Sequence, residues 1–326
     1  MENFSIGVDL GGTNIKFASV SASGKIILEH RVPTEADKGP VRVIENMMTG
    51  ILYLLSLNAD AENAERLLGI GVGVPGVVSL DGGTLSYPPN LPGWQVVRLG
   101  DILKEKLFMA KKLSMPVFIE NDANVAALGE DKFGAGRNLK TFLMITLGTG
   151  IGGGIIVDDK IFRGAHGAAG EIGHITVKYD GDAPANTGIR GSLESFIGQR
   201  QITEYTKKLL AKHPESKLHA MCGNDLSKLE PKLITEAAQR GDHTAIDVWS
   251  YVADVLGAGL GSVVSVLDIR KIVIGGGVAG AGDFVLKPAL EQLKRYTLRS
   301  MHEGLQLIPA QLGNSAGVMG AAAQCI

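Results

Sequence analysis

Residues 6–26 read IGVDLGGTNIKFASVSASGKI, and residues 143–162 read LMITLGTGIGGGIIVDDKIF. Each segment has a short apolar strand, a turn with glycine and threonine, a second strand, and a tight turn before a third strand. The two segments therefore form a weak internal repeat of one supersecondary unit. The sequence predicts an α/β fold of two lobes that each open with a hairpin, with a ligand cleft between the lobes.

The rest of the chain fits this plan. Helical periodicity predicts a helix over residues 41–57, and short apolar runs predict strands over 68–74 and 117–120. After residue 195 the chain is expected to be largely helical to about residue 267. A strand at 271–274 and a helix of small residues at 316–323 follow.

Composition bounds the class of protein. The chain has 326 residues, of which 45% are hydrophobic, enough for about two domains. The formal net charge of −2 argues against a nucleic-acid partner. Only two cysteines occur, Cys222 and Cys325, so a disulfide framework is not expected and a reducing cytoplasm fits.

The first residues, MENFSIGVDLGG, lack the basic and apolar regions of a signal peptide. The longest apolar stretch, residues 251–269, is interrupted by Asp254 and by glycines. It predicts a buried helix and no membrane span. The 44 glycines cluster in short runs directly after apolar strands, which indicates backbone that approaches a ligand.

The first glycine turn, residues 9–16, suits a phosphate. Gly11 and Gly12 let backbone N–H groups approach the phosphate oxygens without a Cβ in the way. Side-chain donors and a cation surround them, at Thr13, Asn14 and Lys16. Asp9 can hold a magnesium ion directly or through water. The alternative is a plain glycine-rich hairpin.

Two further glycine segments follow apolar strands. LGTGIGGG, residues 147–154, is predicted to be a second phosphate turn that faces the first. GGGV, residues 275–278, precedes a helix and can receive a phosphate or a nucleotide base. Gly71, Gly73 and Gly76 match the dinucleotide fingerprint, but VVSLDGGTLSYPP follows Pro75 and predicts no helix. No P-loop motif occurs in the sequence.

Acidic residues near the glycine segments supply candidates for catalysis. Asp122 comes at the tip of a predicted strand, where it can act as a base towards a hydroxyl or can simply cap the next helix. Glu171 and His174 lie in HGAAGEIGH, whose glycines leave room for a ligand. His174 can equally be structural, and Glu194 can be a solvated helix residue.

Taken together, the motifs resemble the ROK family (repressors, open reading frames and sugar kinases), and its glucokinase branch most. The resemblance covers nearly the whole chain. It depends on segments that occur in the family's order: DLGGTNIK, GVGVPG, NLPGW, ENDAN, LGTGIGGG, HGAAGEIGH and GGGV.

The resemblance implies an actin-like fold with two ribonuclease-H-like lobes. We expect an N-terminal lobe of residues 1–120, completed by a helix at about 311–326, and a C-terminal lobe of residues 121–310. It implies Asp122 as catalytic base. It implies sugar contacts from Asn90, Asn121, Asp122, Glu171, His174 and Glu194. It also implies contacts to ATP from Asp9, Gly11, Gly12, Thr13, Asn14, Lys16, Gly148, Thr149, Gly150, Gly276 and Gly277. Mg²⁺ and a homodimer are further expectations.

The chain departs from the family at a zinc site. Many members bind zinc through a histidine and C-x-C-G-x-x-G-C-x-E, whereas Ala185, Thr187 and Ser192 stand at the cysteine positions here. Because thiolates are the ligands that hold structural zinc, no structural zinc is expected. Packing or hydrogen bonds of Arg190 can replace the metal in holding this loop.

The resemblance thus implies ATP-dependent phosphorylation of the terminal hydroxyl of a hexose, with glucose as the favoured sugar by overall similarity. N-acetylglucosamine, N-acetylmannosamine, fructose and allose stay open as substrates, as does polyphosphate as donor. A sugar-responsive repressor is the competing class. The glycine turn begins at residue 9, so a DNA-binding segment ahead of it is not expected. A non-catalytic sugar sensor is disfavoured because the phosphate turns and Asp122 are intact.

Overall fold

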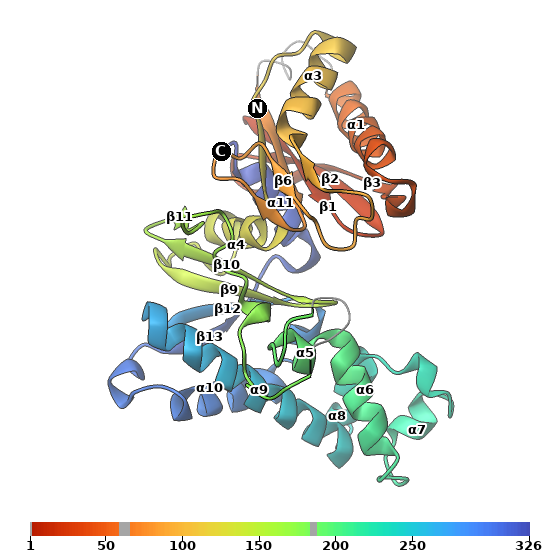
Figure 1. Cartoon of the computed structure of the whole chain (residues 1–326), viewed down its shortest axis with the longest axis vertical. Coiled ribbons are helices and arrows are strands. Elements are labelled where there is room, and N and C mark those ends of the chain that lie inside the picture. Colours follow the sequence, from red (N-terminus) through yellow and green to blue (C-terminus); the bar gives the residue numbers. More distant parts are fainter. Residues whose placement is uncertain (1, 59–65, 183–187) are drawn as a thin grey trace. The chain divides into compact units, whose positions relative to one another are not determined.

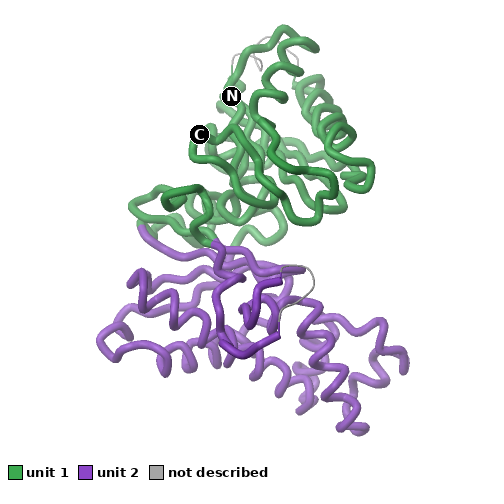
Figure 2. The backbone as a smooth tube through the Cα atoms, in the orientation of Figure 1, with its two compact units in different colours: residues 1–140, 154–170, 311–326 green, residues 141–153, 171–310 purple. Residues whose placement is uncertain are grey.

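The structure is a computed structural model that describes residues 2–58, 66–182 and 188–326. The chain divides into two compact units (Figure 2). Unit 1 comprises Met1–Lys140, Gly154–Gly170 and Gln311–Ile326, and unit 2 comprises Thr141–Gly153 and Glu171–Ala310. The boundary between lobes at residues 120 and 121 stays a prediction, and each unit is described by itself.

Unit 1 contains a five-stranded sheet with the strand order β3-β2-β1-β4-β8. Figure 1 labels its strands β1, β2 and β3. The bounds are β1 (Phe4–Leu10), β2 (Asn14–Ser21), β3 (Ile26–Pro33), β4 (Leu67–Val74) and β8 (Val117–Asn121). β1, β2 and β3 form an antiparallel meander, while β4 runs parallel to β1 and β8 runs parallel to β4. The predicted hairpin and strands are therefore present.

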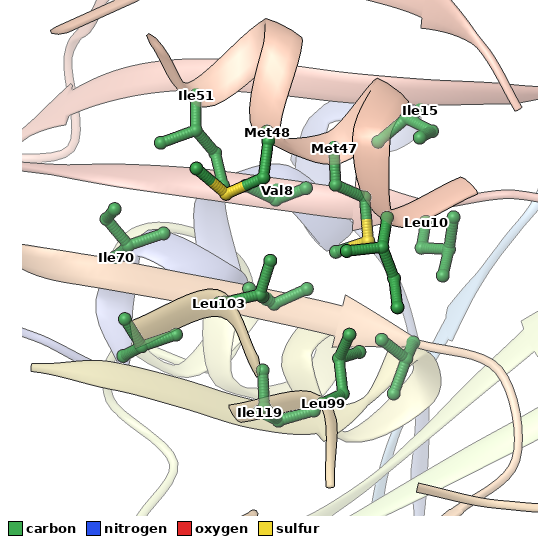
Figure 3. Packing of buried hydrophobic residues seen from close by; sticks show 14 of the residues in the cluster. Val8, Leu10, Ile15, Met47, Met48, Ile51, Ile70, Leu99, Leu103 and Ile119 are labelled. Carbon is green, nitrogen blue, oxygen red and sulfur yellow. The ribbon is translucent and has the colours of Figure 1, made fainter. Parts of the chain in front are cut away.

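One face of this sheet packs on helices α1 (Pro40–Leu57) and α3 (Leu99–Lys111). Ile6, Val8 and Leu10 alternate with smaller or polar residues along β1, and each is almost completely buried. They meet apolar side chains of the helices, including Met47 and Leu103 (Figure 3). Every second side chain of β1 thus packs against the apolar face of the helices, and these contacts form the main core of unit 1.

The other face packs on α11 (Ala316–Ala323), and α4 (Asp122–Phe133) packs on α11 in turn. The backbone of α11 approaches the strands so closely that only glycine fits beneath it. A Cβ at Gly7 would lie 1.9 Å from the carbonyl oxygen of Val318, and one at Gly71 would lie 1.7 Å from that of Ala321. The predicted helix of small residues is therefore a packing element of unit 1.

A small antiparallel sheet follows β4 in unit 1, made of β5 (Val77–Val78), β6 (Leu85–Ser86) and β7 (Val96–Val97). Gly71 and Gly73 lie inside β4, and β5 begins two residues after Pro75. The helix that a dinucleotide fingerprint requires does not begin at these glycines. Unit 1 also contains the 3₁₀ helices η1 (Ala36–Lys38) and η6 (Gly313–Ser315).

The second sheet has the strand order β11-β10-β9-β12-β13. Its strands are β9 (Phe142–Leu147), β10 (Ile151–Val157), β11 (Lys160–Ile161), β12 (Lys271–Gly275) and β13 (Gln306–Pro309). β12 runs parallel to both β9 and β13, whereas β10 and β11 form an antiparallel hairpin.

The second glycine turn is shorter than predicted, because β10 already begins at Ile151. Gly152 to Gly154 therefore belong to a strand and not to the turn. Close packing gives one reason for a glycine in this strand, since a Cβ at Gly154 would lie 2.7 Å from the Cβ of Ala127.

Helices fill most of unit 2. Their bounds are α5 (Glu194–Ile197), α6 (Gln199–Leu210), α7 (Leu218–Met221), α8 (Pro231–Gln239), α9 (His243–Leu267) and α10 (Asp283–Arg295). The 3₁₀ helices are η2 (Ile172–His174), η3 (Leu226–Lys228), η4 (Gly277–Ala281) and η5 (Arg299–Met301).

Helix α9 includes most of the predicted buried helix. By length and composition alone it can cross a membrane, but 50% of its most apolar window is buried inside the protein. It packs along α10, where a Cβ at Gly257 would lie 2.6 Å from the Cβ of Gln292. Such close helix contacts identify α9 as a core element of unit 2.

Candidate functional site

The first glycine turn links β1 to β2 in unit 1. The Gly11 N–H donates to the Asn14 carbonyl (3.1 Å), and the Thr34 N–H donates to the Thr13 carbonyl (2.9 Å). The hydroxyl of the buried Thr34 also donates to the Gly11 carbonyl (2.6 Å). Thr34 thus braces the turn on both sides. Among the described residues, the exposed Gly12 and Thr13 have no acceptor for their amides. These two N–H groups suit an anion.

Asp9 and Lys16 are cross-strand partners at the base of this turn. The Lys16 ammonium lies 3.3 Å from Asp9 Oδ2 and 3.2 Å from the Asn314 carbonyl oxygen. A Cβ at Gly317 would lie 3.0 Å from the Asp9 carboxyl carbon. Lys16, predicted to contact a phosphate, therefore joins the turn to η6, which precedes α11.

Asp9 also bears on the expected magnesium ion. Mg²⁺ keeps several waters and takes one or two carboxylates together with substrate phosphates. A single half-buried carboxylate beside the predicted phosphate turn fits that donor set, although the Lys16 ammonium pairs with the same carboxylate. The described residues contain no cluster of three or more His, Cys, Asp or Glu side chains suited to a metal ion.

Asn90 lies next to the first turn. A Cβ at Gly12 would be 3.8 Å from the Asn90 Cβ, so a loop far along the sequence reaches this turn within unit 1. Asn90 is exposed and has a left-handed backbone (φ 63°), a conformation that asparagine tolerates. The side chain is accordingly accessible to a ligand.

The end of β8 and the start of α4 carry the predicted base. Asn121 is the N-cap of α4: its Oδ1 accepts from the amides of Ala123 (2.9 Å) and Asn124 (3.1 Å). Its Nδ2 donates to the Gly76 carbonyl (3.1 Å). Asn121 is thus the N-cap, and Asp122 Oδ1 also accepts from the Ala123 amide (2.8 Å), so part of the alternative capping role of Asp122 is present as well. Asp122 occupies the first helical position and is exposed.

Glu120 holds the junction between β8 and α4 through hydrogen bonds, and the sequence did not predict this role. Its side chain is almost fully buried and accepts from the Asn121 amide (2.8 Å) and from Asn124 Nδ2 (3.0 Å). It also forms a salt bridge with Arg163. A buried carboxylate needs such partners, but the sequence does not say that Arg163, 43 residues away, supplies one.

The second glycine turn lies in unit 2, at Gly148, Thr149 and Gly150. The Gly148 N–H donates to the Gly150 carbonyl (2.9 Å), and the Gln199 amide donates to the Gly148 carbonyl (3.1 Å). Glu194 Oε2 accepts from the amide of Ile151 at 2.8 Å. Glu194, predicted to contact a sugar, is thus hydrogen-bonded to the residue that follows the turn.

Glu171 is the N-cap of η2 and His174 is its last residue, and His174 Nε2 lies 3.8 Å from Glu171 Oε2. Gly173 packs on β10, since a Cβ there would lie 2.2 Å from the Ile151 carbonyl oxygen. The His174 Nδ1 atom is buried and has no hydrogen-bond partner among the described residues. The segment that carries these two residues therefore contacts Ile151, the residue whose amide Glu194 holds.

The third glycine segment adjoins the second turn in unit 2. Gly276 has a left-handed backbone (φ 88°), and a Cβ there would lie 2.3 Å from the Leu147 carbonyl oxygen. Gly277 is exposed with open space around its Cα. The structure thereby places the predicted adenosine segment beside the predicted phosphate turn.

Hydrogen bonds join the described residues on either side of the positions where many family members have zinc ligands. Positions 185 and 187 lie outside the described residues, while Ser192 is buried. The Leu193 amide donates to Ile175 (2.9 Å), and the Val177 amide donates to Gly191 (2.9 Å). Arg190 Nε donates to the Gly181 carbonyl (3.3 Å), in line with the role expected of Arg190. The lack of zinc itself stays a prediction.

Comparison with known proteins adds a family. The sequence profile described as "ROK family" matches residues 5–325. A glucokinase of Halalkalibacterium halodurans is 38% identical over 97% of this chain and 92% of its own length. A solved ROK family glucokinase of Streptomyces griseus, in complex with glucose and AMPPNP, aligns with a TM-score of 0.82 and 33% identity, over 98% of each chain. A xylose repressor of Caldicellulosiruptor bescii is 29% identical over 98% of this chain and 77% of its own length.

Proposed function

The chain belongs to the ROK family and has the actin-like fold of its sugar kinases, and from that premise we propose that it phosphorylates a hexose with ATP. The favoured reaction is glucose to glucose 6-phosphate. Similarity to a glucokinase and to a glucokinase structure with glucose and an ATP analogue supports this choice. The observation that carries the proposal is Asp122, an exposed carboxylate at the first position of α4 on a segment fixed by Asn121 and Glu120.

Asp122 is proposed as the general base. As the sugar hydroxyl oxygen forms its bond to the γ-phosphorus, the bond from that phosphorus to the β-phosphate oxygen breaks and ADP leaves. The hydroxyl proton passes to the Asp122 carboxylate. Asn121 contributes as the N-cap that fixes the start of α4, where Asp122 Oδ1 also accepts from the Ala123 amide.

The glycine segments are proposed to bind ATP. The amides of Gly12 and Thr13 in unit 1 and the Gly148–Gly150 turn in unit 2 meet phosphate oxygens, and Gly276 and Gly277 lie near the adenosine. Asn14 and Lys16 support the first turn. Asp9 would hold Mg²⁺, whose positive charge would offset the negative charge on the transferring phosphoryl group.

The sugar is proposed to contact Asn90, Asn121 and Asp122 of unit 1 and Glu171, His174 and Glu194 of unit 2. Carboxylates and amides suit hexose hydroxyls because they accept and donate hydrogen bonds in defined directions. Both bonding groups of Asn121 are already used within unit 1, so we assign it a supporting contact. The family also leaves N-acetylglucosamine, N-acetylmannosamine, fructose and allose as alternative substrates.

A coupled ADP-release assay with Mg·ATP against these hexoses tests the proposal. Strong turnover on one sugar confirms the kinase and identifies its substrate. Polyphosphate in place of ATP, followed by sugar-phosphate detection, tests the alternative donor. Turnover on none of the sugars, with each bound measurably by calorimetry, contradicts the proposal.

That negative result would favour a second candidate, a non-catalytic sugar-responsive regulator. The similarity to a xylose repressor over 98% of this chain is the observation behind it. The higher identity to glucokinases and the exposed Asp122 favour the kinase.

Three further expectations belong to the proposed enzyme. We propose a cytoplasmic location, no structural zinc, and no nucleic-acid or membrane partner. We also propose a homodimer, which light scattering coupled to size-exclusion chromatography tests directly.

A further inference from the structure

The Glu194 carboxylate lies at the end of the second glycine turn. Glu194 Oε2 accepts from the Ile151 amide at 2.8 Å. It also lies over Gly150, where an added Cβ would be 2.6 Å from the same oxygen. A carboxylate thus takes one backbone donor beside a turn whose amides are proposed to receive ATP phosphates.

The backbone around Glu194 keeps it at this place. Glu194 begins the short helix α5, and the preceding Leu193 is fully buried, with its amide bonded to Ile175 (2.9 Å). After α5, the Gln199 amide donates to the Gly148 carbonyl (3.1 Å). Both ends of α5 are therefore tied within unit 2, so the carboxylate is directed at the turn by the fold and not by chance orientation of a surface side chain.

A carboxylate and a phosphate compete for the same kind of donor and repel each other. While Glu194 holds the Ile151 amide, a phosphate that approaches Gly150 meets a negative charge. A sugar hydroxyl is neutral and can donate a hydrogen bond to this carboxylate. The Glu194 carboxylate can therefore do two things from one place: it can accept a hydrogen bond from a sugar hydroxyl, and its charge opposes a phosphate.

We infer that Glu194 couples the two substrates: it opposes ATP binding at the Gly148–Gly150 turn until a hexose hydroxyl engages its carboxylate. This inference depends on the proposed function, because it requires that the turn binds ATP phosphates and that Glu194 binds sugar. Its consequence is reciprocal: sugar raises the affinity for ATP and ATP raises the affinity for sugar by the same factor. It also limits transfer of phosphate to water when no sugar is bound.

The test measures binding, not turnover. Calorimetry on the full chain gives the Kd of Mg·AMPPNP with and without saturating glucose. In the native protein we expect glucose to tighten AMPPNP by about 10-fold, a coupling of ordinary size. Glu194→Gln keeps the shape and an amide oxygen acceptor but removes the charge. It should tighten AMPPNP without glucose by about 10-fold and abolish the further gain on adding glucose.

Glu204→Gln is the matched control. It removes an exposed carboxylate of α6 in unit 2 whose described ion-pair partner is Lys207, not the turn. It should leave the Kd of AMPPNP unchanged, both with and without glucose. Glu194→Ala should tighten AMPPNP as Glu194→Gln does.

Two results overturn the inference. One is a native protein in which saturating glucose does not change the Kd of AMPPNP, which needs no variant to be folded. The other is a Glu194→Gln protein that loses glucose affinity while its Kd for AMPPNP without glucose stays native, which leaves Glu194 as a sugar contact alone. Failure of the proposed function shows differently, as absence of hexose phosphorylation by the native protein in the ADP-release assay.

Discussion

The two five-stranded sheets have the same strand order and differ in what they carry. In β3-β2-β1-β4-β8 and in β11-β10-β9-β12-β13, an initial three-strand segment is followed by two strands that join on its other side. The turn between the first two strands is braced by Thr34 in unit 1 and is contacted by Glu194 in unit 2.

The last strands differ as well. β8 ends at Asn121 and leads into Asp122, whereas β13 ends at Pro309 and is followed by Ala310, which has no ionisable group. Two similar scaffolds thus carry different chemistry. We assign the base to unit 1 and the coupling carboxylate to unit 2, and variants that separate these roles test the assignment.

Asp122→Asn should have the largest effect. Removing a general base typically lowers kcat by about 10²–10⁴-fold, while the Asn121 cap keeps α4 in place. The measurement is kcat from ADP release with the best hexose, with Tm as a check on folding.

Asp101→Asn provides the matched control for Asp122→Asn. Asp101 is also an acidic residue in the first turn of a helix of unit 1, and it pairs with Arg98 on the surface. Its kcat should stay native. Near-native turnover of Asp122→Asn would show that Asp122 is not the base. The proposed chemical difference between the two sheets would then be wrong.

Gly71→Ala should have the next largest effect, on stability. The sheet of unit 1 carries glycine under α11, where β12 of unit 2 has Ile272, Val273 and Ile274. A methyl group at Gly71 would collide with the Ala321 carbonyl at 1.7 Å, so we expect a loss of about 3 kcal/mol, the upper part of the overpacking range. Differential scanning calorimetry measures the fall in Tm.

The control for Gly71→Ala is Gly280→Ala, where nothing lies within 4 Å of the added Cβ. Its Tm should stay within a degree or so of the native value, as for surface substitutions without a packing role. An unchanged Tm for Gly71→Ala would mean that α11 does not press on β4 as closely as the structure has it.

Thr34→Val separates the two turns directly. The substitution keeps the shape but leaves the half-buried Gly11 carbonyl without the Thr34 hydroxyl. The cost should be about 1 kcal/mol, the low end for a lost hydrogen-bond partner, because water can reach part of this carbonyl. The first turn should lose order, so KM for ATP rises several-fold while KM for the sugar changes less. The exposed Thr49→Val, which loses only a bond to the Glu45 carbonyl within α1, should leave both constants unchanged. Equal rises in both KM values would show that Thr34 supports the unit as a whole and not the turn.

Local patterns explain what the sequence allowed us to predict. The α/β class, the meander, and the helices that include residues 41–57 and 316–323 follow from periodicity and turn chemistry over short spans. The ROK family, which the comparisons confirm, follows from the order of its motifs. The contacts that position the side chains of the site could not be predicted from the sequence.

Those contacts join residues far apart in sequence. Glu194 meets Ile151 and Glu120 meets Arg163, each 43 residues away, and no periodicity specifies such a pair. The Asn121 cap was missed for another reason. Asn121 and Asp122 are both good capping residues, and only the exact first residue of α4 shows which of them is the N-cap. The overlong second turn was misread because strand glycines resemble turn glycines unless the packing partner is known.

The smallest effect is expected from metal removal, and it concerns a loop of unit 2 that has no counterpart in the sheet of unit 1. The Leu193 and Val177 amides donate hydrogen bonds in this loop. Ala185, Thr187 and Ser192 stand where many family members have zinc-binding cysteines. Incubation with a zinc chelator should therefore leave Tm unchanged, and elemental analysis should find no bound zinc. Gly191→Ala shows that the assay is sensitive to this loop, because a Cβ at Gly191 (φ 60°) would lie 1.7 Å from the Lys178 carbonyl oxygen and should lower Tm. A fall in Tm on chelation would show instead that a metal holds unit 2 through ligands other than cysteine.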